Sequence, residues 1–100
     1  MADYVLSPLA REDIVAIWTH SLTEWGEKQA DRYIAELDSC FETLSSNPKL
    51  GRERHDIKTG YRSFPVGAHV VFYRITNSGI EIIGIPHQRE DPINHIDQIS

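Results

Sequence analysis

The chain has 100 residues, of which 40% are hydrophobic and 25% charged, a composition typical of one small globular domain. No apolar run approaches the ~20 residues that a bilayer-spanning helix needs, so the sequence predicts no membrane span. The single cysteine, Cys40, excludes an internal disulfide framework. Because the N-terminus also lacks a basic flank and an apolar signal core, we expect a cytoplasmic protein.

The net charge of −5 is distributed unevenly along the chain. Residues 1–48 hold 3 basic and 9 acidic side chains, whereas residues 49–100 hold 7 basic and 6 acidic ones. Nucleic-acid-binding proteins usually have a basic face, and the candidate here is at most a local one: a loop with Lys49, Arg52, Arg54 and Lys58, followed by Arg62. Acidic residues are interspersed in that loop, so we interpret it as solvated. We expect protein partners and no sequence-specific binding to nucleic acid.

The first half of the chain reads as a short extended segment and two helices. Residues 3–6 are extended, and Ser7 followed by proline is a strong N-terminal helix signal. Apolar residues then recur every three or four positions as far as Gly26, which is a natural helix stop. A second helix is predicted over residues 27–46, where Asn47-Pro48 ends it. Two helices joined at one glycine predict an antiparallel helical hairpin.

The second half reads as strands. Residues 49–59 are predicted to be loop, with a short turn or strand near residues 55–57. Three strands follow at about 60–65, 68–76 and 79–87, separated by turn residues at hairpin spacing. Isoleucines at 93, 96 and 99 have the spacing of one helical turn. The predicted fold is α+β with the order β-α-α-β-β-β: one antiparallel sheet, covered on one face by the hairpin, with the first strand at an edge.

Short motifs run in a fixed order along nearly the whole chain. They are Leu6 to Ile14, Ile17-Trp18, Trp25-Gly26, Gln29-Ala30, Tyr33, Asn47 to Arg52, Gly60-Tyr61-Arg62, Phe72-Tyr73-Arg74, and His87-Gln88-Arg89 followed by Asp91. In these motifs the chain resembles the ParE toxins, within the wider RelE/ParE toxin superfamily. The resemblance implies one RelE/ParE-like toxin domain over residues 1–100, from a bacterial type II toxin–antitoxin module.

The resemblance also implies a target and a partner. ParE-like members poison DNA gyrase, RelE-like members cut messenger RNA on the ribosome, and a ParD-like antitoxin neutralises the ParE type in a hetero-oligomer. We therefore expect inhibition of gyrase by binding, with no catalysis and no cofactor. Two alternatives stay open: a ribosome-dependent endoribonuclease of the RelE type, and a degenerate toxin that only binds its antitoxin.

Two departures from the ParE pattern favour the degenerate alternative. Pro86 stands where ParE-like sequences tend to have leucine, and Glu90 stands where they tend to have methionine. Proline cannot donate a ladder hydrogen bond, so the last strand must end or bulge at Pro86. Glu90 adds a negative charge beside Arg89. Either change could weaken toxicity while the fold and antitoxin binding persist.

The resemblance gives three candidate contacts with the target, Arg62, His87 and Arg89. The RelE pattern also needs lysines on the sheet face and a tyrosine near the C-terminus, and this chain has no tyrosine after Arg89. That absence favours binding over RNA cleavage, although His87 has the chemistry of a general acid or base. The structural alternative for Arg62 or Arg74 is a cross-strand ion pair with Glu81.

Large side chains on the helical stripes give the candidate antitoxin-binding residues, Trp18, Leu22, Tyr33 and Leu37. The resemblance places the antitoxin in an outer groove of the hairpin and along the sheet edge. Acidic residues on the exposed face would suit a basic antitoxin segment, namely Glu24, Glu27, Asp31 and Glu42. The main alternative for Trp18, Trp25 and Tyr33 is burial in the core.

The remaining reactive side chains carry weaker signals. His87, Asp91 and His95 recur at intervals of four, but the prolines at 86 and 92 oppose a continuous helix, so we expect no metal site. Cys40 lies among apolar residues and is interpreted as a buried thiol. The other histidines, His20, His55 and His69, have no partners at useful spacing. A protein that only grips macromolecules should lack a deep hollow ringed by titratable groups.

Overall fold

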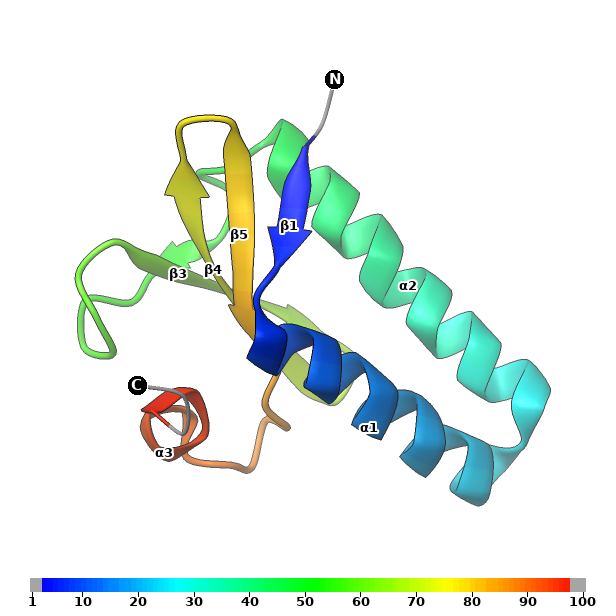
Figure 1. Ribbon diagram of the computed structural model, residues 1–100. Coiled ribbons are helices and arrows are strands. Elements are labelled where there is room, and N and C mark those ends of the chain that lie inside the picture. The colour runs from blue at the N-terminus through cyan, green and yellow to red at the C-terminus, as the bar shows by residue number, and fades with distance from the viewer. Residues whose placement is uncertain (1–2, 98–100) are drawn as a thin grey trace.

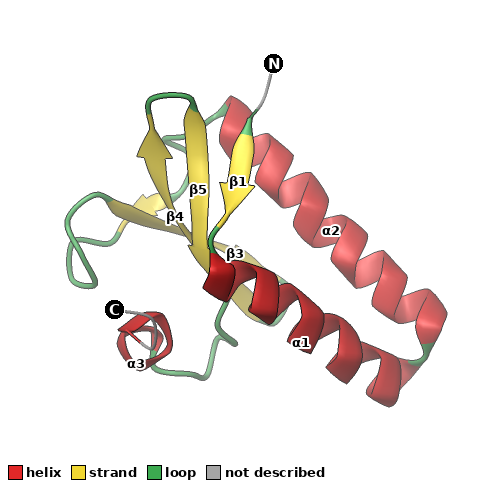
Figure 2. Cartoon of the chain, viewed as in Figure 1, coloured by secondary structure: helices red, strands yellow, loops and turns green. Residues whose placement is uncertain are grey.

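The computed structural model describes residues 3–97, so Ile99 of the predicted terminal turn lies outside the described residues. The elements are β1 (Tyr4–Leu6), α1 (Pro8–Trp25), α2 (Glu27–Ser46), β2 (Arg52–Glu53), β3 (Tyr61–Val66), β4 (His69–Thr76), β5 (Gly79–Gly84) and α3 (Pro92–Asp97). Helices α1 and α2 form an antiparallel hairpin beside the sheet, and the short helix α3 is not part of this hairpin (Figures 1 and 2). The α+β architecture is the predicted one, with β2 and α3 as short additions.

Local signals explain both ends of α1. The Ser7 hydroxyl oxygen accepts a hydrogen bond from the Ala10 amide (3.1 Å), which caps the helix, and its hydrogen is donated to the Ile83 carbonyl (2.6 Å). The cap therefore also fixes the start of α1 to β5. At the other end Gly26 has φ 89°, a left-handed conformation in which glycine carries little strain. The predicted boundaries of both helices are confirmed.

The sheet has the order β1-β5-β4-β3-β2. Strand β1 lies at an edge, as predicted, but it pairs with β5 in parallel, so the prediction of an all-antiparallel sheet is wrong. The two helices and three of the strands separate β1 from β5, which is long enough for the chain to return in the same direction. A local pattern of residues cannot predict which distant strand β1 pairs with.

Two regions after α2 have local causes for their structure. The predicted short turn near residues 55–57 is confirmed, because the Ile57 and Lys58 amides donate to the Arg54 carbonyl oxygen, and the short strand β2 lies just before it at Arg52–Glu53. Strand β5 ends at Gly84 rather than at residue 87, just before Pro86, which cannot donate to the ladder. Pro86 still accepts a hydrogen bond from the Val70 amide (3.0 Å).

The core lies between the helical hairpin and one face of the sheet. Its fully buried members include Leu37, Leu44, Val71, Tyr73 and Ile82. Trp25 is 64% exposed, so the alternative of burial in the core is wrong for this residue. It is the last residue of α1, where the hairpin projects beyond the sheet (Figure 1). Among residues 3–97, none of the helices combines the length and apolar character that crossing a bilayer requires.

Candidate functional site

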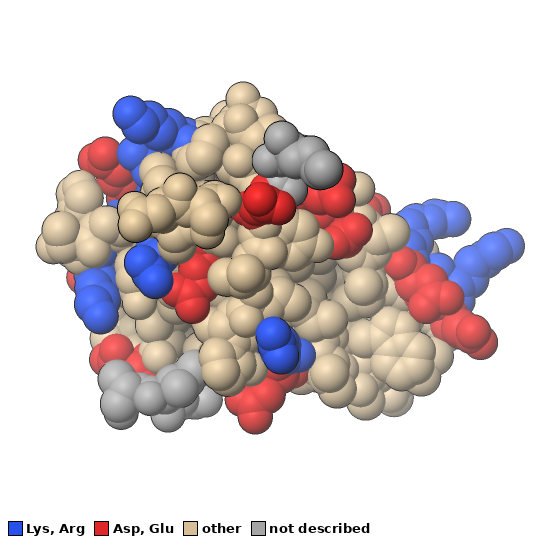
Figure 3. Space-filling view, turned by 45° about the horizontal axis from the view of Figure 1, so that its top comes forward, with Lys and Arg blue, Asp and Glu red and all other residues tan. Residues whose placement is uncertain are grey.

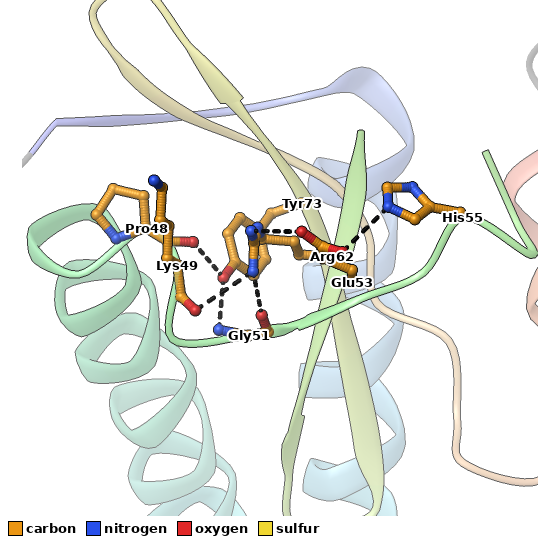
Figure 4. Close-up of polar contacts among 7 residues, drawn as sticks. All are labelled: Pro48, Lys49, Gly51, Glu53, His55, Arg62 and Tyr73. Carbon is orange, nitrogen blue, oxygen red and sulfur yellow. Dashed lines mark hydrogen bonds and ion pairs between the residues drawn. The ribbon is translucent and has the colours of Figure 1, made fainter. Parts of the chain in front are cut away.

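Arg62 and Tyr73 hold the loop that follows α2 (Figure 4). The Tyr73 hydroxyl donates to the Pro48 carbonyl (2.7 Å) and accepts from the Gly51 amide (2.8 Å). A Cβ at position 51 would lie 2.5 Å from that hydroxyl oxygen, so only glycine fits. The Arg62 guanidinium donates to the Gly51 carbonyl (2.7 Å) and to Glu53 (3.2 Å).

These contacts change the interpretation of Arg62. Its side chain is only 15% exposed, and its donors are directed at the loop and at Glu53. A guanidinium engaged in this way must break structural hydrogen bonds before it can bind a phosphate or a target protein. The predicted target contact at Arg62 therefore stays a prediction, and the structure gives this residue a structural role.

Two other arginines near this loop, Arg54 and Arg74, are also paired. Arg54 makes two contacts with Asp56 (both 3.0 Å) and lies over the Phe72 ring, 5.2 Å from its centroid. Arg74 pairs with Glu81 across strands (2.7 Å), which confirms the structural alternative for Arg74. On the face shown in Figure 3, basic and acidic side chains alternate rather than gather into one basic patch. This distribution agrees with the interpretation of a solvated loop.

The segment after β5 presents Arg89 to solvent. The His87 amide donates to Glu90 Oε1 (2.9 Å), and His87 Nδ1 accepts from the Arg89 amide (3.1 Å). These bonds close a tight turn, and the exposed Arg89 side chain has no ion-pair partner among residues 3–97. Of the three candidate target contacts, Arg89 is the one whose side chain is available.

Asp13 is a structural residue that the sequence analysis missed. It is 8% exposed, and its Oδ2 accepts from the Ile85 amide (2.8 Å) and lies 2.8 Å from His95 Nε2. His95 Nδ1 lies 3.2 Å from Glu90 Oε2, so one imidazole joins two carboxylates. We call Asp13, His95 and Glu90 the carboxylate–histidine clasp. It fixes the C-terminal segment and α3 to α1.

The three residues that recur at intervals of four, His87, Asp91 and His95, have different partners in the structure. His95 faces Asp13 and Glu90, His87 is bonded within its own turn, and the Asp91 carboxylate accepts from the Ile93 amide (3.0 Å). Within the described range 3–97, no three His, Cys, Asp or Glu residues are grouped in a way that could hold a metal ion.

A hollow of about 520 Å³ lies between the hairpin and the end of the sheet. We call it the histidine cleft, because it is lined by four of the five histidines: His20, His69, His87 and His95. Its other lining residues include Asp13, Ala16, Ile17, Ser21, Trp25, Gln29, Tyr33, Ile85 and Glu90. We expected no such hollow, and this expectation is wrong.

Most titratable groups of the cleft are occupied by one another. His69 Nδ1 lies 2.7 Å from the Tyr33 hydroxyl, and the rings of His69 and His87 are 5.3 Å apart. Burial, with a smaller effect of His87, lowers the pKa of His69. His69 was expected to lack partners and has two. Among residues 3–97, the Ser21 hydroxyl of the cleft makes no hydrogen bond with a histidine.

A second hollow, of about 470 Å³, follows the outer side of the hairpin. We call it the hairpin groove; it is lined by Tyr4, Leu6, Ile14, Trp18, Asp31, Ile34, Ala35, Asp38 and Phe41. Trp18 Nε1 donates to Asp31 (3.2 Å), and the Tyr4 hydroxyl donates to Asp38. That hydrogen bond, together with burial, raises the pKa of Tyr4 to about 12. The groove is therefore apolar with acidic side chains in its wall.

The four candidate antitoxin-binding residues do not share one surface. Trp18 lines the hairpin groove, whereas Tyr33 lines the histidine cleft. Leu22 is half-buried, and Leu37 is fully buried in the core, so its side chain cannot touch a partner directly. The acidic residues predicted to be exposed, Glu24, Glu27, Asp31 and Glu42, are all exposed.

Comparison with known proteins identifies the family. Residues 4–92 match the family described as "ParE toxin of type II toxin-antitoxin system, parDE". The chain belongs to the ParE toxin family. It is thus a ParE-type toxin of a type II toxin–antitoxin module, as its motifs predicted.

Two relatives agree with this assignment, and two solved structures share the fold. The chain is 38% identical over 96 residues to Toxin ParE1 of Caulobacter vibrioides, which covers 96% of this chain and 99% of that one. It is 38% identical over 89 residues to Toxin ParE1 of Mycobacterium tuberculosis, covering 88% and 91%. The fold is similar to a chain of the chromosomal ParDE TA system from P. aeruginosa, with TM-score 0.74, 19% identity, and coverage of 87% and 96%. A chain of the YoeB-YefM complex from Staphylococcus aureus is less similar, with TM-score 0.57, 16% identity, and coverage of 88% and 98%.

Proposed function

We propose that this ParE-type toxin inhibits DNA gyrase by binding and is neutralised by a ParD-like antitoxin. The main support is its 38% identity to a ParE toxin over almost the full length of both chains. The engagement of Arg62 adds support, because an RNA-cutting toxin needs cations that are free to stabilise phosphate. The toxin therefore acts through contact surfaces and catalyses no reaction of its own.

Arg89 is the proposed anchor for the target. Arginine is favoured at interface hot spots, and this side chain is exposed on a turn that two hydrogen bonds fix. His87 is half-buried, and its Nδ1 atom accepts a hydrogen bond from the Arg89 amide, so it stabilises the turn that carries Arg89.

A supercoiling assay with purified gyrase tests this site. The full-length toxin should inhibit supercoiling, and Arg89→Ala should require roughly tenfold more protein for the same inhibition, as loss of a hot spot implies. Arg74→Ala is the matched control, because Arg74 is also exposed and has only a cross-strand partner. Unchanged supercoiling at high toxin excess would refute the proposal, and ribosome-linked messenger RNA cuts in primer extension would point to the RelE-type activity.

The hairpin groove is the proposed binding site of the antitoxin. Its apolar wall fits the apolar face of an amphipathic helix, and the acidic residues Asp31 and Asp38 fit basic side chains at the edge of that helix. Trp18 is one of three aromatic side chains that line the groove, with Tyr4 and Phe41. We therefore retain Trp18 as a contact and assign Leu37 the role of a core residue beneath the surface.

Binding of the cognate antitoxin to two tryptophan variants distinguishes the two hollows. Trp18→Ala should weaken binding by roughly tenfold or more, whereas Trp25→Ala, at the histidine cleft, should leave the affinity nearly unchanged. The opposite order would place the antitoxin in the cleft. Both residues are exposed tryptophans of the same helix, so each controls for the other.

A further inference from the structure

The histidine cleft is lined by a hydroxyl, that of Ser21, which has no hydrogen-bond partner in the described part of the chain. Ser21 is 2% exposed, and among residues 3–97 its side chain has no hydrogen-bond partner. The hydroxyls of Thr19 and Thr23 on the same helix instead donate to carbonyl oxygens four residues earlier (2.8 and 3.0 Å). Among residues 3–97, every fully enclosed side-chain oxygen has a partner, so the Ser21 oxygen is accessible from the cleft that this residue lines. The hydroxyl therefore has room for a hydrogen-bond partner from outside the chain.

Two imidazoles supply donors to the same cleft. His87 Nδ1 accepts from the Arg89 amide, so the neutral ring carries its hydrogen on Nε2. The Tyr33 hydroxyl has one hydrogen, and its contact with His69 Nδ1 (2.7 Å) is shorter than its contact with the Val66 carbonyl (3.1 Å). When that hydrogen goes to His69, this ring also carries its own hydrogen on Nε2. Both rings therefore offer an N–H donor, which fits a hydrogen-bond acceptor.

The rest of the lining is mostly apolar. Ala16, Ile17 and Ile85 supply aliphatic surface, and Trp25 supplies an aromatic wall that is 64% exposed. Exposed aromatic surface beside a hollow is common at ligand sites. The volume of about 520 Å³ also lies within the ~300–1,000 Å³ that small-molecule sites usually occupy.

The charges at one end of the cleft select against anions. Asp13 and Glu90 share the single imidazole of His95, so this end has no surplus positive charge to attract an anion. The Nε2–H donors of His69 and His87 leave their hydrogen bonds unmade with a cation, which has no acceptor to offer them. An uncharged molecule avoids both costs.

We propose that the histidine cleft binds an uncharged small molecule that combines an apolar body with carbonyl-type hydrogen-bond acceptors. The acceptors meet Ser21 and the two imidazoles, and the apolar body covers Ile17, Ile85 and Trp25. The site shares no residue with the hairpin groove, and its test requires neither gyrase nor the antitoxin. Its lining includes His87 and Glu90, which also close the turn that carries Arg89.

A charge series of one compound tests the proposal on the full-length toxin. The probe is N-acetyl-L-leucine amide, with N-acetyl-L-leucine as its anionic counterpart and L-leucine amide as its cationic one. Titrations are followed by NMR of the histidine ring signals. We expect saturable shifts of His69 and His87 with a dissociation constant on the order of 1 mM, as the usual affinity per atom gives for ~12 heavy atoms. Each charged compound should bind at least about threefold more weakly.

Substitutions that fill the cleft locate the site. Ser21→Leu should weaken binding of the amide by at least about tenfold, whereas Ser39→Leu, the same change at an exposed position of α2, should not. Should Ser21→Leu not fold, Ala16→Phe fills the cleft from an exposed position of α1 and should give the same loss. Absence of saturable shifts with all three compounds would mean that the cleft holds only water. That result, equal binding of the charged compounds, or full binding to the cleft-filled variants would each overturn the proposal.

Discussion

Asp13→Ala should destabilise the fold more than its position on a solvent-facing helix suggests. The Asp13 carboxylate accepts from the Ile85 amide and contacts His95, and its side chain is 10% exposed. Alanine removes both interactions and leaves an amide of the buried residue Ile85 without a partner. The loss therefore falls on the connection between α1, the end of β5 and α3.

The magnitude follows from the two broken contacts. An unpaired buried amide costs about 1–3 kcal/mol. His95 also loses the Asp13 oxygen as a hydrogen-bond partner, which adds about 1 kcal/mol, and it keeps Glu90. We expect a total loss of about 2–4 kcal/mol, against ~5–15 kcal/mol for the stability of an ordinary domain.

Urea unfolding of the variants measures this loss directly. Glu12→Ala is the matched control, because Glu12 is exposed and precedes Asp13 on α1, and it should change stability by less than about 0.5 kcal/mol. Asp13→Asn keeps an acceptor for the Ile85 amide and should lose less than alanine does. Hydrogen exchange at Ile85 should become faster in Asp13→Ala. A cost below about 1 kcal/mol together with unchanged protection of Ile85 would refute the anchoring role of Asp13.

Three further changes test the contacts of Arg62 and Tyr73 with the loop after α2, and the histidine cleft. Arg62→Ala should cost about 1–3 kcal/mol in urea unfolding, because two loop carbonyls and Glu53 lose their donor, and an unchanged midpoint would contradict this. Tyr73→Phe should cost a similar ~1–3 kcal/mol and speed exchange of the Gly51 amide, which loses its acceptor. The folded-state pKa of His69 is lowered, so its contribution to stability is present above the unfolded pKa of ~6.5 and is lost as the pH falls towards the folded pKa. His69→Gln should flatten this part of the pH–stability curve, and an unaltered slope would show that His69 does not cause it.

The helices and most of the sheet could be predicted from the sequence because their signals are local. The Ser7 cap and the Gly26 stop lie within one turn of the helix ends that they specify. The parallel pairing of β1 with β5 was not predictable in this way, since it joins Tyr4 to Ile80 across most of the chain. The sequence could not decide whether Trp25 is buried or exposed, because the apolar spacing of α1 continues past the point where the sheet ends.

The candidate sites were harder to predict because they depend on distant residues. Asp13 and His95 are separated by 82 positions, and no spacing rule connects them. One signal was present: Asp13 stands four residues after Leu9 and four before Ile17, inside the apolar stripe of α1. A carboxylate in such a stripe indicates a buried acceptor that must have a partner. The histidine cleft, in contrast, needs the positions of both helices and of the β3–β4 turn.

Glu90 shows how a departure from a family pattern can be structural. Its charge lies next to Arg89 in the sequence, yet its two oxygens are directed at the His87 amide and at His95. The carboxylate therefore closes the turn that presents Arg89 and also ties that turn to α1 through the clasp. Methionine at this position would have no acceptor for either contact. Glu90 thus stabilises the turn that carries Arg89 and does not form an ion pair with the Arg89 side chain. For this reason Glu90 by itself does not indicate a degenerate toxin.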